Sequence, residues 1–310
     1  MTGAPIPEPV GSTDHPDPAA AVFAAHRRAV VGAAYRVLGS LADAEDVAQE
    51  TWLRWSAARP AEVVDPRAYL VRIGTRLALN RARQLSRRRE EYVGPWLPEP
   101  VGDPARVGAD ADLELADSVS YALLVLLAAL TPAERAAFVL HDVFAVPYPE
   151  VAESLGRSEP AVRQLVHRAR THLRERAPRH PVDRRTHAEV TARFLRATQD
   201  GALDALVELL APDVVLLTDG GGQRQAALRP VLGREKVLRF TAGVLGKPEA
   251  ATFSVRACTV NGDPAIGLYT TAADGSAVVD SVCVLVLDDG LVTTVLLQRN
   301  PDKLAGVRPS

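Results

Sequence analysis

The hydrophobic pattern of the chain changes its period along its length, and this change limits the folds that the chain can adopt. Over residues 21–92 and 115–178 apolar residues recur every three to four positions, which is typical of amphipathic helices. Towards the C-terminus they occur in short runs bounded by turn residues, which is typical of strands in hairpins. The turn signals are Asn261-Gly262, Asp274-Gly275 and Asp289-Gly290. The order predicts two all-α domains followed by an α+β domain.

A chain of 310 residues is too long for one compact domain, and stretches rich in Pro, Gly and Asp mark its boundaries. We predict a disordered tail (1–20), a helical domain (21–92), a linker (93–114), a second helical domain (115–178), a joint (179–185) and an α+β domain (186–305). No apolar run approaches the ~20 residues that span a bilayer, and the N-terminus lacks the features of a signal peptide. We therefore expect a cytoplasmic protein without membrane contact.

The distribution of arginine is more informative than the net charge of −2. From Pro66 to Arg89 there are eight arginines and no acid. The apolar residues of this run, Tyr69, Leu70, Ile73 and Leu77, predict a helix with one buried stripe. A solvated helix face usually mixes acids with bases, so the run favours binding to a polyanion, with affinity that is independent of base sequence.

The preceding segment reads as a helix that begins near Asp43, which we predict to be its N-cap. One face is apolar and is formed by Ala44, Val47, Ala48, Thr51, Trp52 and Trp55. The opposite face carries Asp46, Gln49 and Glu50, a pattern that is also compatible with simple solvation.

These two segments, DAEDVAQETWLRW and DPRAYLVRIGTRLALNRARQLSRRR, resemble region 2 of the extracytoplasmic-function (ECF) sigma factors. The resemblance implies that the acidic face contacts the β′ clamp of RNA polymerase and that the arginine-rich helix opens and reads the −10 element. The implied polymerase-binding residues are Asp46, Gln49, Glu50 and Trp52. The implied −10 residues are Arg72, Arg76, Asn80, Arg81 and Arg83.

The second helical domain contains a helix-turn-helix pattern. Thr131, Pro132 and Glu134 form a capping box with Pro at the first helical position. A later helix stops at Gly156, and a basic helix follows that Ser158 is expected to cap. The apolar face of the basic helix is formed by Val162, Leu165, Val166, Ala169 and Leu173.

This second pattern, YPEVAESLGRSEPAVRQLVHRARTHLRER, resembles sigma region 4, which reads the −35 element and contacts the β flap. The implied base-facing residues are Ser158, Glu159, Arg163, Gln164 and His167, and Arg168 is assigned to the DNA backbone. No second His or Cys is placed to share a metal with His167, so we expect neither a metal nor another cofactor.

The third domain, which opens with THAEVTARFLRATQDG, resembles the SnoaL-like branch of the NTF2-like cone fold, which walls a pocket with a bent sheet. Asp219 and Asp280 are the candidate carboxylates for an isomerase, but no His or Tyr partner is evident and Asp219 also suits a turn. We therefore expect no enzyme activity, and two alternatives remain: a pocket that senses a ligand, or a domain without a ligand. Cys258 and Cys283 are expected to be buried thiols.

Three short motifs resemble those of a sigma subgroup with a fused SnoaL-like domain, where they are thought to form a docking surface between domains. They are WLPEP in the linker, DGGG after a strand and NPDKL near the end. The implied interdomain regulatory residues are Trp96, Leu97, Pro98, Asp219, Asn300, Asp302 and Lys303. A stiff linker with an incidental Trp is the alternative for WLPEP.

Together the patterns favour an alternative sigma factor that binds core RNA polymerase and promoter DNA and is modulated by its own C-terminal domain. A small-molecule ligand and a separate anti-sigma protein are further candidate partners. Two rivals are a DNA-binding regulator that uses only the helix-turn-helix, and a regulator fused to an isomerase-type enzyme.

Overall fold

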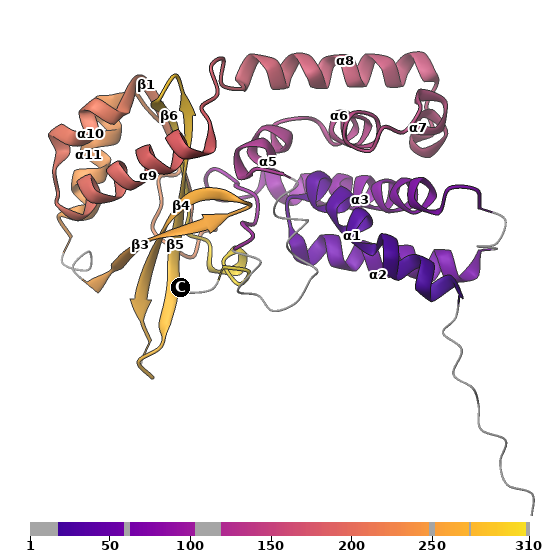
Figure 1. Cartoon of the computed structure of the whole chain (residues 1–310), viewed down its shortest axis with the longest axis horizontal. Coiled ribbons are helices and arrows are strands. Elements are labelled where there is room, and N and C mark those ends of the chain that lie inside the picture. The colour runs from indigo at the N-terminus through magenta and orange to yellow at the C-terminus, as the bar shows by residue number, and fades with distance from the viewer. Residues whose placement is uncertain (1–17, 59–62, 103–118, 248–251, 273, 308–310) are drawn as a thin grey trace, which may run out of the picture.

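Three modules follow one another along the chain (Figure 1). The computed structural model describes residues 18–58, 63–102, 119–247, 252–272 and 274–307, apart from the side chains of 87–90. The predicted order of two all-α modules and one α+β module is confirmed. No helix within these ranges is both long enough and apolar enough to span a membrane.

The first helical module consists of α1 (Pro18–Leu38), α2 (Leu41–Ala57) and α3 (Pro66–Glu90). The expectation that Asp43 caps α2 is wrong: Ser40 is the N-cap, and its Oγ accepts from the Asp43 amide at 3.3 Å. The carboxylate of Glu99, far along the chain, accepts from the Leu41 amide at 2.8 Å. The predicted tail was three residues too long, because α1 begins at Pro18, and residues 1–17 lie outside the described ranges.

The second helical module consists of α5 (Tyr121–Ala128), α6 (Pro132–Phe138), a π-helical turn η3 (Val139–Val143), α7 (Tyr148–Leu155) and α8 (Glu159–Arg176). The capping box of Thr131 and Glu134 is confirmed. Gly156 ends α7 at φ 62°, a conformation that glycine adopts without strain. The five apolar residues predicted for one face of α8 are all buried.

The C-terminal module consists of α9 (Arg184–Gln199), α10 (Leu203–Leu209), β1 (Leu210–Asp219), β2 (Val231–Leu232), α11 (Arg234–Leu245), β3 (Ser254–Val260), β4 (Asp263–Thr271), β5 (Ala277–Asp288), β6 (Leu291–Gln298) and the 3-10 turn η5 (Pro301–Lys303). The strand order is β2-β1-β6-β5-β4-β3. β1 and β6 are parallel, and the other neighbours are antiparallel.

One boundary and one helix in this module differ from the sequence prediction. α9 begins inside the predicted joint, because Asp183 caps it by accepting from the Thr186 amide at 2.7 Å. β1 begins at Leu210, immediately after the last residue of α10. α11 was not predicted.

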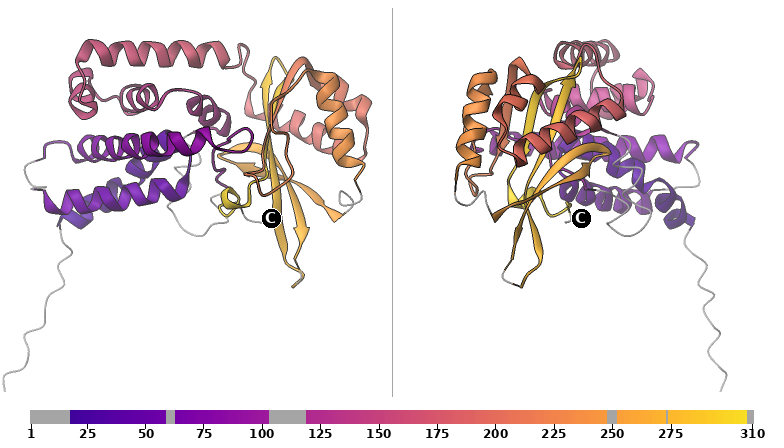
Figure 2. Two further views of the ribbon diagram at one scale, coloured as in Figure 1. Left: turned by 180° about the vertical axis from the view of Figure 1, so that it is seen from behind. Right: turned by 60° about the vertical axis from the view of Figure 1, so that its left-hand side comes forward.

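Both faces of the sheet are covered by other parts of the chain. Helices α9, α10 and α11 lie on one side of it, and the two helical modules lie on the other (Figures 1 and 2). Because side chains alternate along a strand, Leu216 and Val295 join the core beneath the helices of the C-terminal module, whereas Leu296 joins the core shared with α1 and α5. The C-terminal module is therefore packed against the rest of the chain.

The β3–β4 hairpin anchors this packing through its turn. Asn261 is only 2% exposed and adopts φ 50°. Its Oδ1 accepts from the Val101 amide at 3.1 Å, and its Nδ2 donates to the Tyr35 hydroxyl at 3.2 Å. One turn residue thus joins the sheet to the linker and to α1.

We expect Asn261→Gly to lower the free energy of unfolding by about 2 kcal/mol, because two buried hydrogen bonds at roughly 1 kcal/mol each are lost while the backbone conformation is kept. Asn261→Ala should cost about 1 kcal/mol more, because alanine disfavours positive φ. Urea unfolding measures both. Asp289→Gly, at an exposed turn with the same φ of 50°, is the control and should change stability by less than about 0.5 kcal/mol. If Asn261→Gly is as stable as the parent, the hairpin anchor is wrong.

Candidate nucleic-acid interface and interdomain junction

The basic face of α3 is accessible over most of its length. Arg76, Asn80, Arg81 and Arg83 are exposed, and Arg72 is half-buried. Arg72, Arg76 and Asn80 follow one another at intervals of four residues and so share one face of the helix. Arg81, one residue after Asn80, points to a different side of the helix. It pairs with Asp43 of α2 at 2.6 Å and lies 3.6 Å from Asp46.

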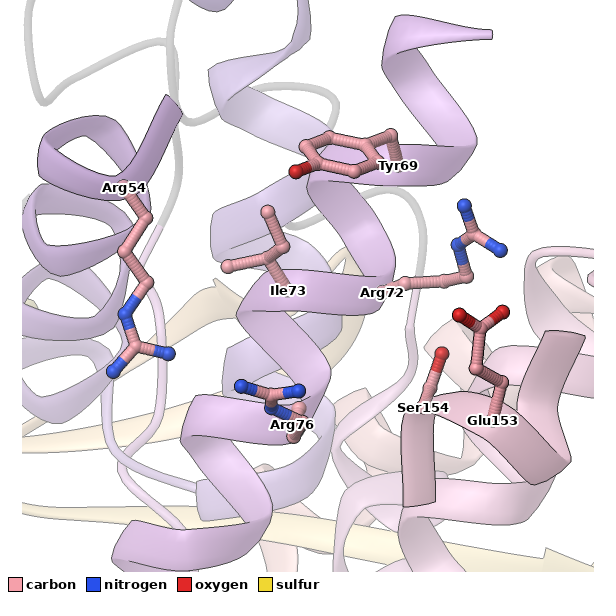
Figure 3. Close-up of a pocket in the computed structure, with 7 residues that line it drawn as sticks. All are labelled: Arg54, Tyr69, Arg72, Ile73, Arg76, Glu153 and Ser154. Atoms are coloured by element: carbon pink, nitrogen blue, oxygen red, sulfur yellow. The ribbon is translucent and has the colours of Figure 1, made fainter. Parts of the chain in front are cut away.

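A cleft of about 280 Å³ lies between α2, α3 and α7, and Figure 3 shows the side chains around it. It is lined by Arg54, Tyr69, Arg72, Ile73, Arg76, Glu153 and Ser154. Three arginines and one tyrosine ring meet there, a combination suited to a phosphate and a stacked base. The acid Glu153 and the hydroxyl Ser154 come from the second helical module, so both modules form the walls.

Arg72 is held by the second helical module. Its Nη1 donates to Glu150 Oε2 of α7 at 2.7 Å. The buried guanidinium of Arg135 in α6 makes a second contact between the modules by donating to the Val37 carbonyl of α1 at 2.5 Å. The two helical modules are thus joined face to face in this structure.

The acidic face of α2 is open to solvent. Asp46, Gln49 and Glu50 are exposed, and Trp52 is half-buried with its ring 5.3 Å from that of Phe23. Sequence reasoning missed Leu53, which is 65% exposed beside these acids. The sequence did contain a signal for it, since a large apolar residue on the polar face of a predicted helix is typical of an interaction surface.

The polar face of α8 is exposed along the helix. Ser158, Arg163, Gln164, His167 and Arg168 are exposed, and Glu159 is half-buried. Arg163 is held in place by Glu159, whose Oε1 accepts from Nε at 3.1 Å, and by the ring of Tyr148, 4.2 Å away. Sequence reasoning missed Tyr148, because its contact with Arg163 depends on the angle between α7 and α8, which the sequence pattern does not give.

A buried ion pair lies at the centre of a second site, the interdomain junction, which comprises Tyr92, Trp96, Leu97, Asp219, Asn300 and Lys303. Asp219 is 0% exposed, and its Oδ2 pairs with Lys303 Nζ at 2.7 Å. The same carboxylate accepts from the Tyr92 hydroxyl at 2.6 Å and the Leu97 amide at 2.8 Å. The Lys303 ammonium also lies 4.2 Å from the Trp96 ring centre. Linker, sheet and C-terminal segment therefore meet at one charge pair.

The surrounding residues close the junction. The Asn300 side chain donates to the Tyr92 hydroxyl at 2.9 Å and caps the Asp302 amide at 3.0 Å. A Cβ on Gly221 would lie 2.4 Å from Asn300, so only glycine fits there. Pro98 is buried and its carbonyl accepts from the Tyr121 hydroxyl of α5 at 2.8 Å.

The junction rejects one alternative and corrects one expectation. WLPEP is packed, so the free-spacer alternative does not hold, and Asp219, for which the sequence offered no His or Tyr partner, is a buried charge with a tyrosine partner. That partner, Tyr92, was missed because 127 residues separate the two in sequence. Burial raises the pKa of Tyr92 well above its usual range, so the phenol remains a hydrogen-bond donor.

The remaining reactive groups are occupied or buried. Asp280 pairs with Arg299 at 3.0 Å. Burial raises the pKa of Cys258 to about 11 and that of Cys283 to about 12, so both thiols stay protonated. In the described part of the chain, no three His, Cys, Asp or Glu residues are grouped to hold a metal ion.

Comparisons with known proteins agree with this architecture. Residues 22–88 match Sigma-70 region 2, residues 120–173 match Sigma-70, region 4, and residues 191–295 match a SnoaL-like domain. The chain is 40% identical over 295 residues to the ECF RNA polymerase sigma factor SigJ of Mycobacterium tuberculosis, covering 92% of each chain. The chain belongs to the ECF RNA polymerase sigma factors.

A second relative and a solved structure support membership of the sigma factor family over most of the chain. The probable ECF sigma factor SigI of Mycobacterium tuberculosis is 32% identical over 296 residues, which is 94% of this chain and 97% of SigI. The crystal structure of SigJ superposes with a TM-score of 0.73 at 36% identity, over 94% of this chain and 99% of that one. The resemblance noted in the sequence, to an ECF sigma factor with a fused SnoaL-like domain, is confirmed.

We expect Lys303→Met in this sigma factor to lower the free energy of unfolding by about 3 kcal/mol, because Asp219 would be left buried without its cation. Asp219→Asn combined with Lys303→Met should recover part of that loss, since no buried charge remains. Chemical denaturation measures both. Lys236→Met, at an exposed position on α11, is the control and should be near neutral. An equal effect of Lys236→Met would mean that the junction is not the cause.

Proposed function

We propose that this sigma factor binds core RNA polymerase through α2, the −10 element through α3 and the −35 element through α8, while its C-terminal module controls the arrangement of these surfaces. One observation supports this proposal above the others: two exposed arginine faces belong to two helical modules that are held together by direct contacts. A promoter offers two elements to such a pair, and tethering raises the effective concentration of the second contact.

The polymerase contact is assigned to the acidic face of α2. Asp46, Gln49 and Glu50 with the exposed Leu53 combine charge with an apolar anchor, as interface patches do. We assign this face to the β′ clamp and the second helical module to the β flap. An anti-sigma protein that covers either surface would compete with polymerase.

The residues assigned to the −10 element differ in how accessible they are to DNA. Arg76, Asn80 and Arg83 are open to a melted strand, and the cleft beside Tyr69 offers a place for an extruded base. Arg72 belongs to the same face but is engaged by Glu150. We infer that this structure is a closed arrangement, in which DNA must displace Glu150 to reach Arg72.

The −35 residues are assigned to α8. Its N-terminal turns would enter the major groove, where Arg163 and Gln164 can meet base edges. Ser158, Glu159 and His167 flank them, and Arg168 is assigned to phosphate. Tyr148 and Glu159 hold Arg163 before DNA arrives, which lowers the entropy lost on binding.

The decisive experiment is reconstitution of the purified full chain with bacterial core polymerase. A complex on gel filtration and a promoter-specific run-off transcript are expected. A chain that binds DNA through α8 but forms no core complex would instead be a conventional helix-turn-helix regulator.

We expect Asp46→Ala with Glu50→Ala to weaken core binding about tenfold, because charges at an interface steer encounter and hold the complex. Glu189→Ala with Glu208→Ala removes the same charge from exposed sites on the C-terminal module and should leave core binding unchanged. Fluorescence anisotropy with labelled sigma factor measures both. Equal losses in the two double variants would show a general charge effect and not a docking face.

We expect Glu150→Gln to raise affinity for mixed-sequence single-stranded DNA about two- to fivefold, because a half-exposed ion pair contributes up to ~1 kcal/mol. Release of Arg72 to one phosphate should also steepen the salt dependence by about 0.7 in log–log slope. Glu175→Gln, which makes the same charge change at an exposed position on α8, is the control. If both variants gain affinity equally, Glu150 does not mask Arg72.

A further inference from the structure

A cavity of about 860 Å³ lies inside the C-terminal module, between the sheet and α11. Its walls are largely apolar and come from Phe240, Val244, Phe253, Leu268 and Leu297. A volume of this size accommodates a small organic molecule. The interdomain junction lies on the other face of the same sheet, so the cavity is a separate site.

One buried hydroxyl in the cavity lacks a partner. Ser281 is 1% exposed and lines the cavity, and its Oγ has no hydrogen-bond partner among the described residues. β5 bulges beside it: Ser281 pairs with Leu268 and Val279 with Tyr269, so Asp280 is the extra residue. Buried hydroxyls are normally satisfied, so Ser281 indicates a group that a ligand would supply.

The charges around the cavity favour an anion. Arg299 is neutralised by Asp280 at 3.0 Å. Arg224 and Lys247 are exposed and complete the charged lining, so two cations remain without a lining carboxylate. Lys247 Nζ donates to the Gln225 side chain at 2.6 Å, and no ion pair of Lys247 is found within the described ranges. Apolar walls with cations at exposed positions suit a molecule with an apolar body and one acidic group.

The cavity and the junction share the two parallel strands β1 and β6. Thr218 pairs in register with Leu297, and both line the cavity. The next pair, Asp219 with Gln298, points to the opposite face: Asp219 accepts from the Leu97 amide, and Gln298 Nε2 donates to the Pro98 carbonyl at 3.1 Å. On each of the two strands, a residue that lines the cavity is therefore followed directly by a residue that contacts the linker.

A second connection runs through the turn after β1. The Arg299 guanidinium donates to the Gln225 carbonyl at 2.6 Å, and the Gln223 side chain donates to Asp302 at 2.6 Å. Gln223, Gln225 and Arg299 all line the cavity, whereas Asp302 follows the junction residue Asn300. A ligand that contacts this turn contacts the segment that positions the junction.

We propose that the cavity binds a small amphipathic organic anion and that its occupancy alters how β1 and β6 hold the linker. The regulatory consequence rests on the proposed function, but binding and its effect at the junction do not. The apolar walls receive the body of the ligand, a polar atom of that body meets the Ser281 hydroxyl, and Arg224 and Lys247 receive its acidic group.

The test uses 8-anilinonaphthalene-1-sulfonate as an anionic probe and N-phenyl-1-naphthylamine as its neutral analogue. We expect the full chain to bind the anion saturably at one site. Arg224→Glu should weaken that binding about three- to tenfold and leave the neutral probe unaffected. Arg229→Glu, an exposed charge reversal outside the lining, should change neither. Val244→Trp fills the cavity and should weaken both probes.

Coupling is measured by hydrogen exchange at the Leu97 amide, which donates to Asp219. Saturation with the anion should change its exchange rate at least about threefold in the parent chain and not in Val244→Trp. Thermal unfolding establishes that each variant is folded.

The outcomes separate the claims. Absent binding of the anion, or equal binding by the parent, Arg224→Glu and Val244→Trp, overturns the site. Binding in the cavity without a change at Leu97 overturns the coupling. Core binding and run-off transcription are measured without probe, so their failure would count against the proposed function and not against the cavity.

Discussion

The structure depends on one charge pair placed where water is excluded. Asp219 is 0% exposed and Lys303 is 13% exposed, and a carboxylate in such a place is stable only with a cation and several donors. The donors come from the end of the first helical module, from the linker and from the chain after β6. Satisfying this single carboxylate therefore requires segments that are far apart in sequence to meet.

The sheet extends the effect of that junction. Its strands alternate, so one face completes a core with the helices of its own module and the other completes a core with α1 and α5. A sheet buried on both faces transmits strain because both interiors are close-packed. The C-terminal module is thus packed against both helical modules, and the cavity beside α11 lies on the face of the sheet opposite the linker contact.

The two arginine-bearing helices differ in how their arginines are held. On α8 the polar face is exposed and Arg163 is held by the ring of Tyr148 from its own module, whereas Arg72 of α3 has an acid from the other module as its partner. DNA phosphates can replace a carboxylate at an arginine at small cost, because a half-exposed ion pair contributes little. The contact between α3 and α7 is therefore suited to a reversible closed arrangement.

The sequence by itself determined the fold class of each module, the order of the modules and the location of the arginine faces, because these follow from hydrophobic period and local charge. It indicated that Asp219, Trp96 and Lys303 belong to one surface, but only through resemblance. Only the tertiary structure decided which distant residues meet: Tyr92 beside Asp219, Glu150 beside Arg72 and Glu99 at the start of α2. Those pairs depend on the angles and distances at which modules pack, which a local pattern of residues does not encode.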